Sequence, residues 1–160
     1  CATLGLLASL PVTAQEGTRV VGKFGDWTLY AHDGTAKICF LAAEPKSSEP
    51  KGANRDPVLF YVSGWPKEGV KTEASVKLGY SIRKNAPATA TVGSATFKLL
   101  AADDRGFVAD PTNELKLIEA MKKGASLVVS ATSERGTTTR DTYSLQGIGQ
   151  GLAALANGCG

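Results

Sequence analysis

An alternating apolar segment with a central turn, residues 27–42, constrains the fold more than any other part of the chain. It reads WTLYAHDGTAKICFLA, and its Asp33-Gly34 pair is a two-residue turn of the kind that joins twisted antiparallel strands. With that pair at the turn centre, Thr28 is predicted to face Cys39 across the hairpin. Side chains alternate between the faces of a strand, so Cys39 is predicted to lie opposite the apolar face. The predicted apolar face comprises Trp27, Leu29, Ile38 and Phe40.

The rest of the chain contains further short strand-like runs separated by turn residues. Strands are predicted at 58–62, 74–80, 97–100, 107–108, 127–129 and 137–143. Two more hairpins are predicted, with turns at residues 103–106 and 133–136. Strands and helices do not alternate, which argues against a parallel sheet. We therefore predict a mainly β fold, an antiparallel β-sandwich or partly open barrel with two short peripheral α-helices.

Two segments have helical spacing. Asp110 is predicted to cap a helix that begins at Pro111 and ends before Gly124. The second helix is predicted over residues 145–156, where three glycines each weaken it by roughly 1 kcal/mol relative to alanine. Packing, and a bond from Cys159 to Cys39, would then have to hold that helix in place. The predicted apolar stripe of the first helix comprises Leu115, Leu117, Ile118 and Met121.

A polar, proline-containing segment, residues 44–57, separates the first hairpin from the next strand. It reads EPKSSEPKGANRDP and has no strong hydrophobe, so it is predicted to be a surface loop. Two interpretations stay open for it, a solvated connector and a segment that binds a partner.

The first fourteen residues, CATLGLLASLPVTA, are uncharged. They are too short to span a bilayer of about 30 Å. Small residues before Gln15 indicate a cleavage site, so we predict that residues 1–14 are the remnant of a secretory signal peptide and residues 15–160 a single β domain. A buried N-terminal helix is the alternative, and Pro11 argues against it. Cys1 has two interpretations, a lipid-modified residue and a small apolar residue of the leader.

Two cysteines, Cys39 and Cys159, then remain after the leader. An even number of cysteines in an exported chain predicts a disulfide. Its loop would span 159 − 39 = 120 residues, for which chain entropy gives a stabilisation of about 5 kcal/mol. Two separate buried thiols are the alternative. The spacing excludes a C-x-x-C redox or zinc motif.

Few residues offer catalytic or ligand-binding chemistry. His32 is the only histidine, and register does not place it opposite Cys39. Residues 81–84 match S-x-x-K but follow a strand, and the motif's usual partner sequences are absent. Asp103 and Asp104 supply too few oxygens for calcium. The net charge is only +3, and the lysines and arginines are scattered along the sequence. Both observations argue against nucleic-acid binding. We predict no catalytic residue, no cofactor and no metal site.

Several segments, in this order, resemble the invasion-associated locus B (IalB) family of alphaproteobacteria over about residues 20–159. The segments are FGDWTLY (24–30), KICF (37–40), PKSSEPKG (45–52), VSGWPKEGVK (62–71), SVKLGY (75–80), VGSATF (92–97), LIEAMKKG (117–124) and SERGTTTRDTYSLQG (133–147). The resemblance implies an exported envelope protein that is periplasmic, associated with the outer membrane or secreted. The family's paired cysteines correspond to Cys39 and Cys159, and the family supplies no catalytic motif to carry over.

The resulting functional expectation is a non-enzymatic binding or accessory role, with host-cell interaction or invasion as the role that the family's name suggests. The expected partner is an unidentified envelope or host protein. No nucleic-acid partner is expected. No transmembrane segment is predicted in the mature chain, and association with a membrane surface stays open. The alternative is a small exported ligand carrier or hydrolase with a cavity between the sheets.

The predicted disulfide has a direct test. Replacing Cys39 with Ser should lower the melting temperature strongly under oxidising conditions, because the denatured chain regains the entropy of the opened loop. In excess reductant the same substitution should change the melting temperature little. Thermal unfolding of the parent and C39S proteins in both conditions measures this, and equal melting without reductant would reject the bond.

Overall fold

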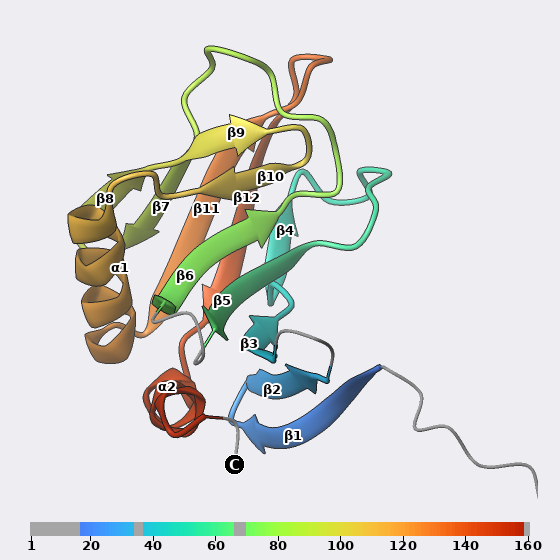
Figure 1. Ribbon diagram of the computed structural model, residues 1–160. Coiled ribbons are helices and arrows are strands. Elements are labelled where there is room, and N and C mark those ends of the chain that lie inside the picture. Colours follow the sequence, from blue (N-terminus) through green and yellow to red (C-terminus); the bar gives the residue numbers. More distant parts are fainter. Residues whose placement is uncertain (1–16, 34–36, 66–69, 159–160) are drawn as a thin grey trace, which may run out of the picture.

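The computed structural model describes residues 17–33, 37–65 and 70–158, and in these residues twelve strands form two antiparallel sheets (Figure 1). The larger sheet contains, in spatial order, β1 (Thr18–Phe24), β2 (Trp27–His32), β3 (Ile38–Ala43), β5 (Leu59–Trp65), β6 (Val70–Lys77), β10 (Arg105–Phe107) and β9 (Leu100–Ala102). The smaller sheet contains β4 (Ser47–Glu49), β12 (Thr138–Ser144), β11 (Ser126–Thr132), β7 (Thr89–Val92) and β8 (Ala95–Lys98). The helices are α1 (Pro111–Lys123) and α2 (Ile148–Ala156).

The predicted fold class is confirmed: the chain is mainly β, with two antiparallel sheets that do not close into a barrel and two helices at their margins (Figure 1). The predicted leader, the position of Gly34 and Cys159 lie outside the described residues.

Aromatic side chains join the two sheets in the core. Phe60 of β5 packs edge-on against Trp27 of β2 and against Tyr143 of β12, with ring centroids 6.1 and 5.7 Å apart. All three residues are almost completely buried. The indole Nε1 of Trp27 donates a hydrogen bond to the carbonyl oxygen of Ser144 at 2.9 Å. Apolar burial and this bond together hold the larger sheet against the end of β12.

The first hairpin forms, but its predicted register is wrong by three residues. Tyr30 pairs with Phe40, whereas a turn centred on Asp33-Gly34 pairs it with Lys37. An odd shift exchanges the two faces of β3. Cys39 therefore lies on the same face as Trp27, where it is fully buried, and Phe40 lies on the outward face. The connection is longer than the two residues predicted from Asp-Gly.

The hairpin around residues 103–106 forms, but its first strand is not the one predicted. Leu100–Ala102 pairs with Arg105–Phe107 in the larger sheet, while Phe97 belongs to β8 and pairs with Ala90 in the smaller sheet. The chain thus changes sheets at Leu99, a buried residue whose N–H donates to the carbonyl oxygen of Ala88. Alternation of apolar residues alone does not reveal such a crossing.

Helix α1 begins and ends at the predicted residues. The Asp110 carboxylate accepts a hydrogen bond from the N–H of Thr112 at 2.8 Å, and Pro111 occupies the first turn. Its buried face differs from the predicted stripe: Leu115 is 61% exposed. The helix contacts β6 of the larger sheet and β7 and β8 of the smaller one, so it covers one side of the sandwich. Its buried residues are Leu117, Ile118 and Met121.

Helix α2 packs on the inner face of β2 and β3, and its first turn depends on Gly147. Gly147 has φ +88°, and a Cβ there would overlap the backbone carbonyl of Phe24 in β1. Gly151 lies so close to Leu41 that a Cβ would be 2.8 Å from one of its methyl groups. Two of the three glycines that weaken the isolated helix, Gly147 and Gly151, therefore permit its close packing. No helix in the described part of the chain has the length and apolar character needed to cross a membrane.

Two glycine substitutions in this region should have opposite effects. Gly147→Ala should destabilise the protein by about 1–3 kcal/mol from its left-handed backbone conformation, with the clash against Phe24 adding to that cost. Gly149→Ala is the matched control, because nothing lies within 4 Å of the added Cβ and alanine favours the helix by about 0.5–1 kcal/mol. Urea unfolding of both variants measures the difference. Equal stability would contradict the backbone contact between α2 and β1.

Candidate functional site

A buried ion pair lies at the centre of the most polar part of the sandwich. Arg55, in the segment between β4 and β5, donates from Nη1 and Nη2 to the two carboxylate oxygens of Asp141 in β12, at 2.8 and 2.9 Å. Its Nε and Nη2 also donate to the carbonyl oxygen of Leu78, at 3.1 and 2.7 Å. The two side chains are only 9% and 0% exposed. Arg55 thus links the smaller sheet to the end of β6.

Asp141 compensates the burial of the Arg55 charge. Burial disfavours the guanidinium charge, but the hydrogen bonds and negative charge of Asp141 outweigh that cost and raise the pKa of Arg55. An unpaired charge at this depth would be strongly unfavourable. The segment 44–57, expected to be a surface loop, is therefore tied down by Arg55 and also contributes β4, which pairs with β12.

Tyr80 packs beside this pair and marks the inner wall of a pocket. The Arg55 guanidinium lies over the Tyr80 ring at 5.1 Å from its centroid. The Tyr80 hydroxyl and the Thr139 hydroxyl are 2.6 Å apart and hydrogen-bonded. Burial raises the pKa of Tyr80, against a smaller opposing effect of the Thr139 hydrogen bond, so the phenol is neutral at physiological pH.

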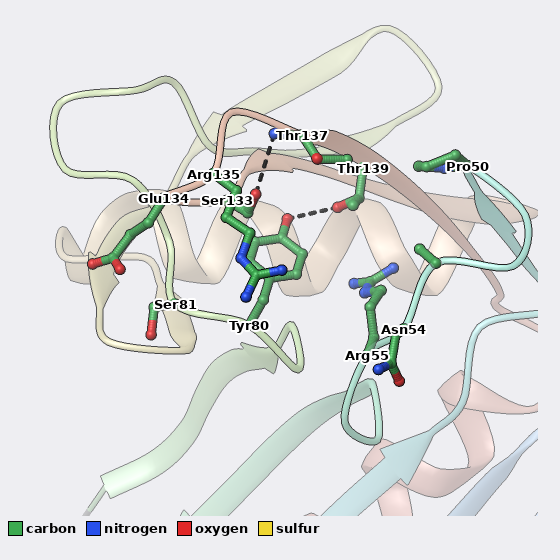
Figure 2. A pocket seen from close by; sticks show the side chains of 11 residues that line it. Pro50, Asn54, Arg55, Tyr80, Ser81, Ser133, Glu134, Arg135, Thr137 and Thr139 are labelled. Atoms are coloured by element: carbon green, nitrogen blue, oxygen red, sulfur yellow. Dashed lines mark hydrogen bonds between the residues drawn. The ribbon is translucent and has the colours of Figure 1, made fainter.

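The pocket opens at one end of the sandwich, with a volume of about 690 Å³ (Figure 2). Its walls come from the β4–β5 segment, the segment after β6 and the β11–β12 turn. The lining residues are Pro50, Ala53, Asn54, Arg55, Tyr80, Ser81, Ser133, Glu134, Arg135, Thr137 and Thr139. Most of these carry hydroxyl, amide or guanidinium groups, so the pocket suits a polar ligand.

The charges at the pocket mouth are unequal. In Figure 2 the Arg135 side chain extends from the β11–β12 turn toward the side on which Tyr80 lies, whereas Glu134 points away. Arg135 forms no salt bridge within the described residues. Arg83 adds a third guanidinium nearby, since its Nη2 donates to the carbonyl oxygen of Glu134 at 3.2 Å. The mouth therefore favours an anionic group.

One inward hydroxyl near the ion pair has no partner. Tyr143 follows Asp141 on the inward face of β12, and its hydroxyl is buried without a hydrogen bond in the described part of the structure. Burial raises the pKa of Tyr143, with a further increase from the negative charge of Asp141. This phenol belongs to the core and does not line the pocket.

The residues considered for catalysis from the sequence do not assemble into an active site. His32 accepts or donates one bond, with Thr18 Oγ1 at 3.3 Å, and alternation places it on the face opposite Cys39. Ser81 lines the pocket, but no base is hydrogen-bonded to its hydroxyl in the described structure. Asp103 and Asp104 form the turn between β9 and β10. Within residues 17–33, 37–65 and 70–158, no three His, Cys, Asp or Glu side chains group as a metal site would require.

The predicted disulfide stays a prediction, because Cys159 lies outside the described residues. What the structure places is Cys39, fully buried on the inward face of β3. Helix α2 packs on that same face through Gly151 and Leu41, and the helix ends at Ala156. The last turn of α2 thus leads into the segment that carries Cys159.

A second surface of interest is the outward face of the larger sheet. Tyr30 stacks on Phe40 at 5.2 Å between ring centroids, and Phe40 meets Tyr61 edge-on at 5.9 Å. The Arg105 guanidinium lies 5.7 Å from the Tyr61 ring centroid. Burial among these groups raises the pKa of Tyr61. These four residues, which come from β2, β3, β5 and β10, form what we call the aromatic row; β6 lies between β5 and β10.

The aromatic row continues into exposed apolar residues toward both edges of the sheet. Val20, which pairs with Tyr30, is 62% exposed, and Leu100, which pairs with Phe107, is 43% exposed. Other apolar residues at outward strand positions are Ala102, which is exposed, and Ile38, Leu59 and Phe107, which are partly buried. In a strand with one solvated face, apolar residues usually point to the core and polar residues point to water. The outward face of the larger sheet departs from this pattern because many of its residues are apolar.

Comparison with known proteins assigns the chain to a family. The model of the family described as "Invasion associated locus B (IalB) protein" matches residues 27–156. The chain belongs to the invasion-associated locus B family. A solved structure, the crystal structure of invasion associated protein B from Bartonella henselae, matches with a TM-score of 0.59 and 18% identity, covering 85% of this chain and 95% of the other. That likeness shows the shared fold, and no curated protein matches the chain.

Neither the pocket nor the ion pair between Arg55 and Asp141 is predicted from the sequence. Asp141 lies two residues before Tyr143 and two after Thr139, so strand alternation places this carboxylate on the same face as both. A charged residue at an inward position requires a buried partner. That signal points to Asp141, but nothing in the sequence identifies Arg55, 86 residues away, as the partner.

Removing Arg55 should lower the stability of the fold strongly, and the loss should depend on whether Asp141 is still present. Arg55→Met should destabilise the fold by about 3–5 kcal/mol, because it leaves the Asp141 carboxylate buried without compensation. The double variant Arg55→Met, Asp141→Leu should recover most of that loss. Arg19→Met is the control, since the Arg19–Asp33 pair is half exposed and should matter little. Urea unfolding measures all three, and equal effects of the two arginine substitutions would contradict this role.

Proposed function

We propose that this IalB-family chain is an exported bacterial envelope protein that acts without catalysis, by binding another protein through its aromatic row. The single observation that carries the binding role is the outward face of the larger sheet. Tyr, Phe and Arg are enriched at the centres of protein interfaces, and this face brings Tyr30, Phe40, Tyr61 and Arg105 together.

The charged side chains at the strand positions of this face are mainly basic, which favours an acidic partner. Among outward strand positions whose side chains the structure describes, Lys23, Lys77 and Arg105 are basic and Glu73 is acidic. A partner with an apolar centre and a carboxylate-rich rim would complement this face. Two copies of the chain would bring basic surfaces together, so self-association through this face is disfavoured. The partner we propose is an acidic protein of the envelope or of a host cell.

Export is supported by sequence alone. Residues 1–14 have the uncharged, small-residue character of a leader, and two cysteines follow it. Fractionation of bacteria that express the tagged full-length gene product tests this part, with the processed protein expected in the periplasm, at the outer membrane or in the medium. Recovery of an unprocessed protein from the cytoplasm would overturn it.

The binding face is tested by site-specific photo-crosslinking in the producing bacteria, or during their contact with host cells. A photoreactive residue at Phe40 should yield one discrete adduct that weakens at high salt, because screening reduces the charge complementarity. The adduct should fade when Tyr61→Ser is added. Ser130, on β11 of the smaller sheet, is the matched control position and should yield no such adduct.

Three results would contradict the proposed face: equal adducts from both positions, no adduct from Phe40, or an adduct to a second copy of this chain. Circular dichroism of Tyr61→Ser must match the parent. The Tyr61 side chain is only partly buried, so its replacement should leave the fold intact.

A further inference from the structure

We propose that the pocket between the β4–β5 segment, the segment after β6 and the β11–β12 turn binds a saccharide that carries a carboxylate. This site is separate from the aromatic row, so it stands or falls independently of the proposed protein partner. Its volume of about 690 Å³ falls within the range of about 300–1,000 Å³ typical of small-molecule sites.

Open polar groups line the pocket and match a polyhydroxylated ligand. Asn54, Ser81 and Thr137 have side-chain amide or hydroxyl groups with no hydrogen bond inside the described protein. The Ser133 hydroxyl accepts from the Thr137 N–H at 3.1 Å and keeps its own proton to donate. Hydroxyl and amide groups both donate and accept hydrogen bonds. Each sugar hydroxyl also donates and accepts, so these groups can bind it in either role.

Apolar surface makes up about half of the lining and lies beside these polar groups. It includes Pro50, Ala53 and the exposed part of the Tyr80 ring. A purely lipid-like ligand would leave the hydroxyl groups without partners, which is costly. A sugar ring, with hydroxyls at its edge and C–H groups on its faces, satisfies both kinds of surface.

The guanidinium groups supply the carboxylate recognition. Arg135 is exposed, forms no ion pair within the described residues and extends toward the Tyr80 side of the pocket (Figure 2). A guanidinium binds a carboxylate through two parallel hydrogen bonds. Arg55 lines the opposite wall, and its Nη1 has one N–H beyond the bond to Asp141. The Glu134 carboxylate points away from Arg135 and forms no ion pair with it (Figure 2).

The walls are fixed before any ligand binds. Backbone bonds join Arg83 N–H to the carbonyl oxygen of Thr132 at 2.8 Å and Glu134 N–H to that of Ser81 at 3.0 Å. The Arg55–Asp141 pair holds the remaining wall. Binding therefore does not have to order the backbone of the three segments.

Calorimetric titration of the full chain tests the proposal with two acidic sugars of different origin. Tetragalacturonate represents a repeated uronate of microbial or plant polysaccharide, and sialyllactose represents a terminal acid of host glycans. Binding of either supports the proposal, and their relative affinity identifies the source. Galactotetraose and lactose are the neutral counterparts, and each should bind at least about tenfold more weakly because the charged hydrogen bonds are lost.

Arg135→Gln should weaken acidic-sugar binding by at least about tenfold. Arg140→Gln is the matched control, because it removes the same charge from β12 on the exposed face of the sheet and should leave binding unchanged. Amide chemical shifts should move at Ser81, Thr137 and Thr139. Both arginines are exposed, so both variants should fold, which circular dichroism verifies.

Four outcomes would overturn the proposal. They are no binding of either acidic sugar, equal binding of neutral and acidic sugars, equal affinities of the R135Q and R140Q proteins, and shift changes confined to another surface. Displacement of the sugar by inorganic phosphate at equal concentration would reduce the pocket to a simple anion site and would also reject it. None of these results bears on export or on the aromatic row.

Discussion

The bidentate contact between Arg55 and Asp141 is the interaction on which the polar end of this protein depends. The guanidinium reaches a carboxylate in the smaller sheet and the Leu78 carbonyl at the end of β6. It therefore connects the two layers through charged hydrogen bonds. Buried charge is stable only when it is paired and hydrogen-bonded, and here each oxygen of Asp141 receives one N–H. The same contact places Arg55 over Tyr80 and so forms the inner wall of the pocket.

Different physical forces hold the two ends of the molecule. At one end, Trp27, Phe60 and Tyr143 interlock between the sheets, and α2 packs against the inner face of β3 with two glycines at its closest approaches. Apolar burial dominates there. At the other end, hydrogen bonds and charge fix three segments around a polar opening. The separation leaves the core closed while polar groups remain open in the pocket walls, which is the arrangement expected of a scaffold that presents a binding site on its loops.

Two surfaces remain available for recognition, and they differ in chemistry. The pocket offers hydroxyl, amide and guanidinium groups in a concave site, which suits a small polar ligand. The outward face of the larger sheet offers Tyr30, Phe40 and Tyr61 across neighbouring strands, which suits a protein surface. The segments of the family resemblance lie along both regions, from the first hairpin to the β11–β12 turn. Because the two surfaces are separate, the two proposed ligands would not compete for one site.

The sequence by itself determined the local elements. It gave the class of fold, the cap of α1 at Asp110, the hairpin across residues 133–136 and the family, because hydrophobic period, capping and turn chemistry are short-range properties. Tertiary structure alone decided the register of β2 and β3, the change of sheet at Leu99 and the pairing of Arg55 with Asp141. These features depend on which distant side chains compete for the same buried space. A three-residue difference in one turn was enough to move Cys39 into the core and Phe40 onto the surface, since side-chain direction in a strand reverses at every residue.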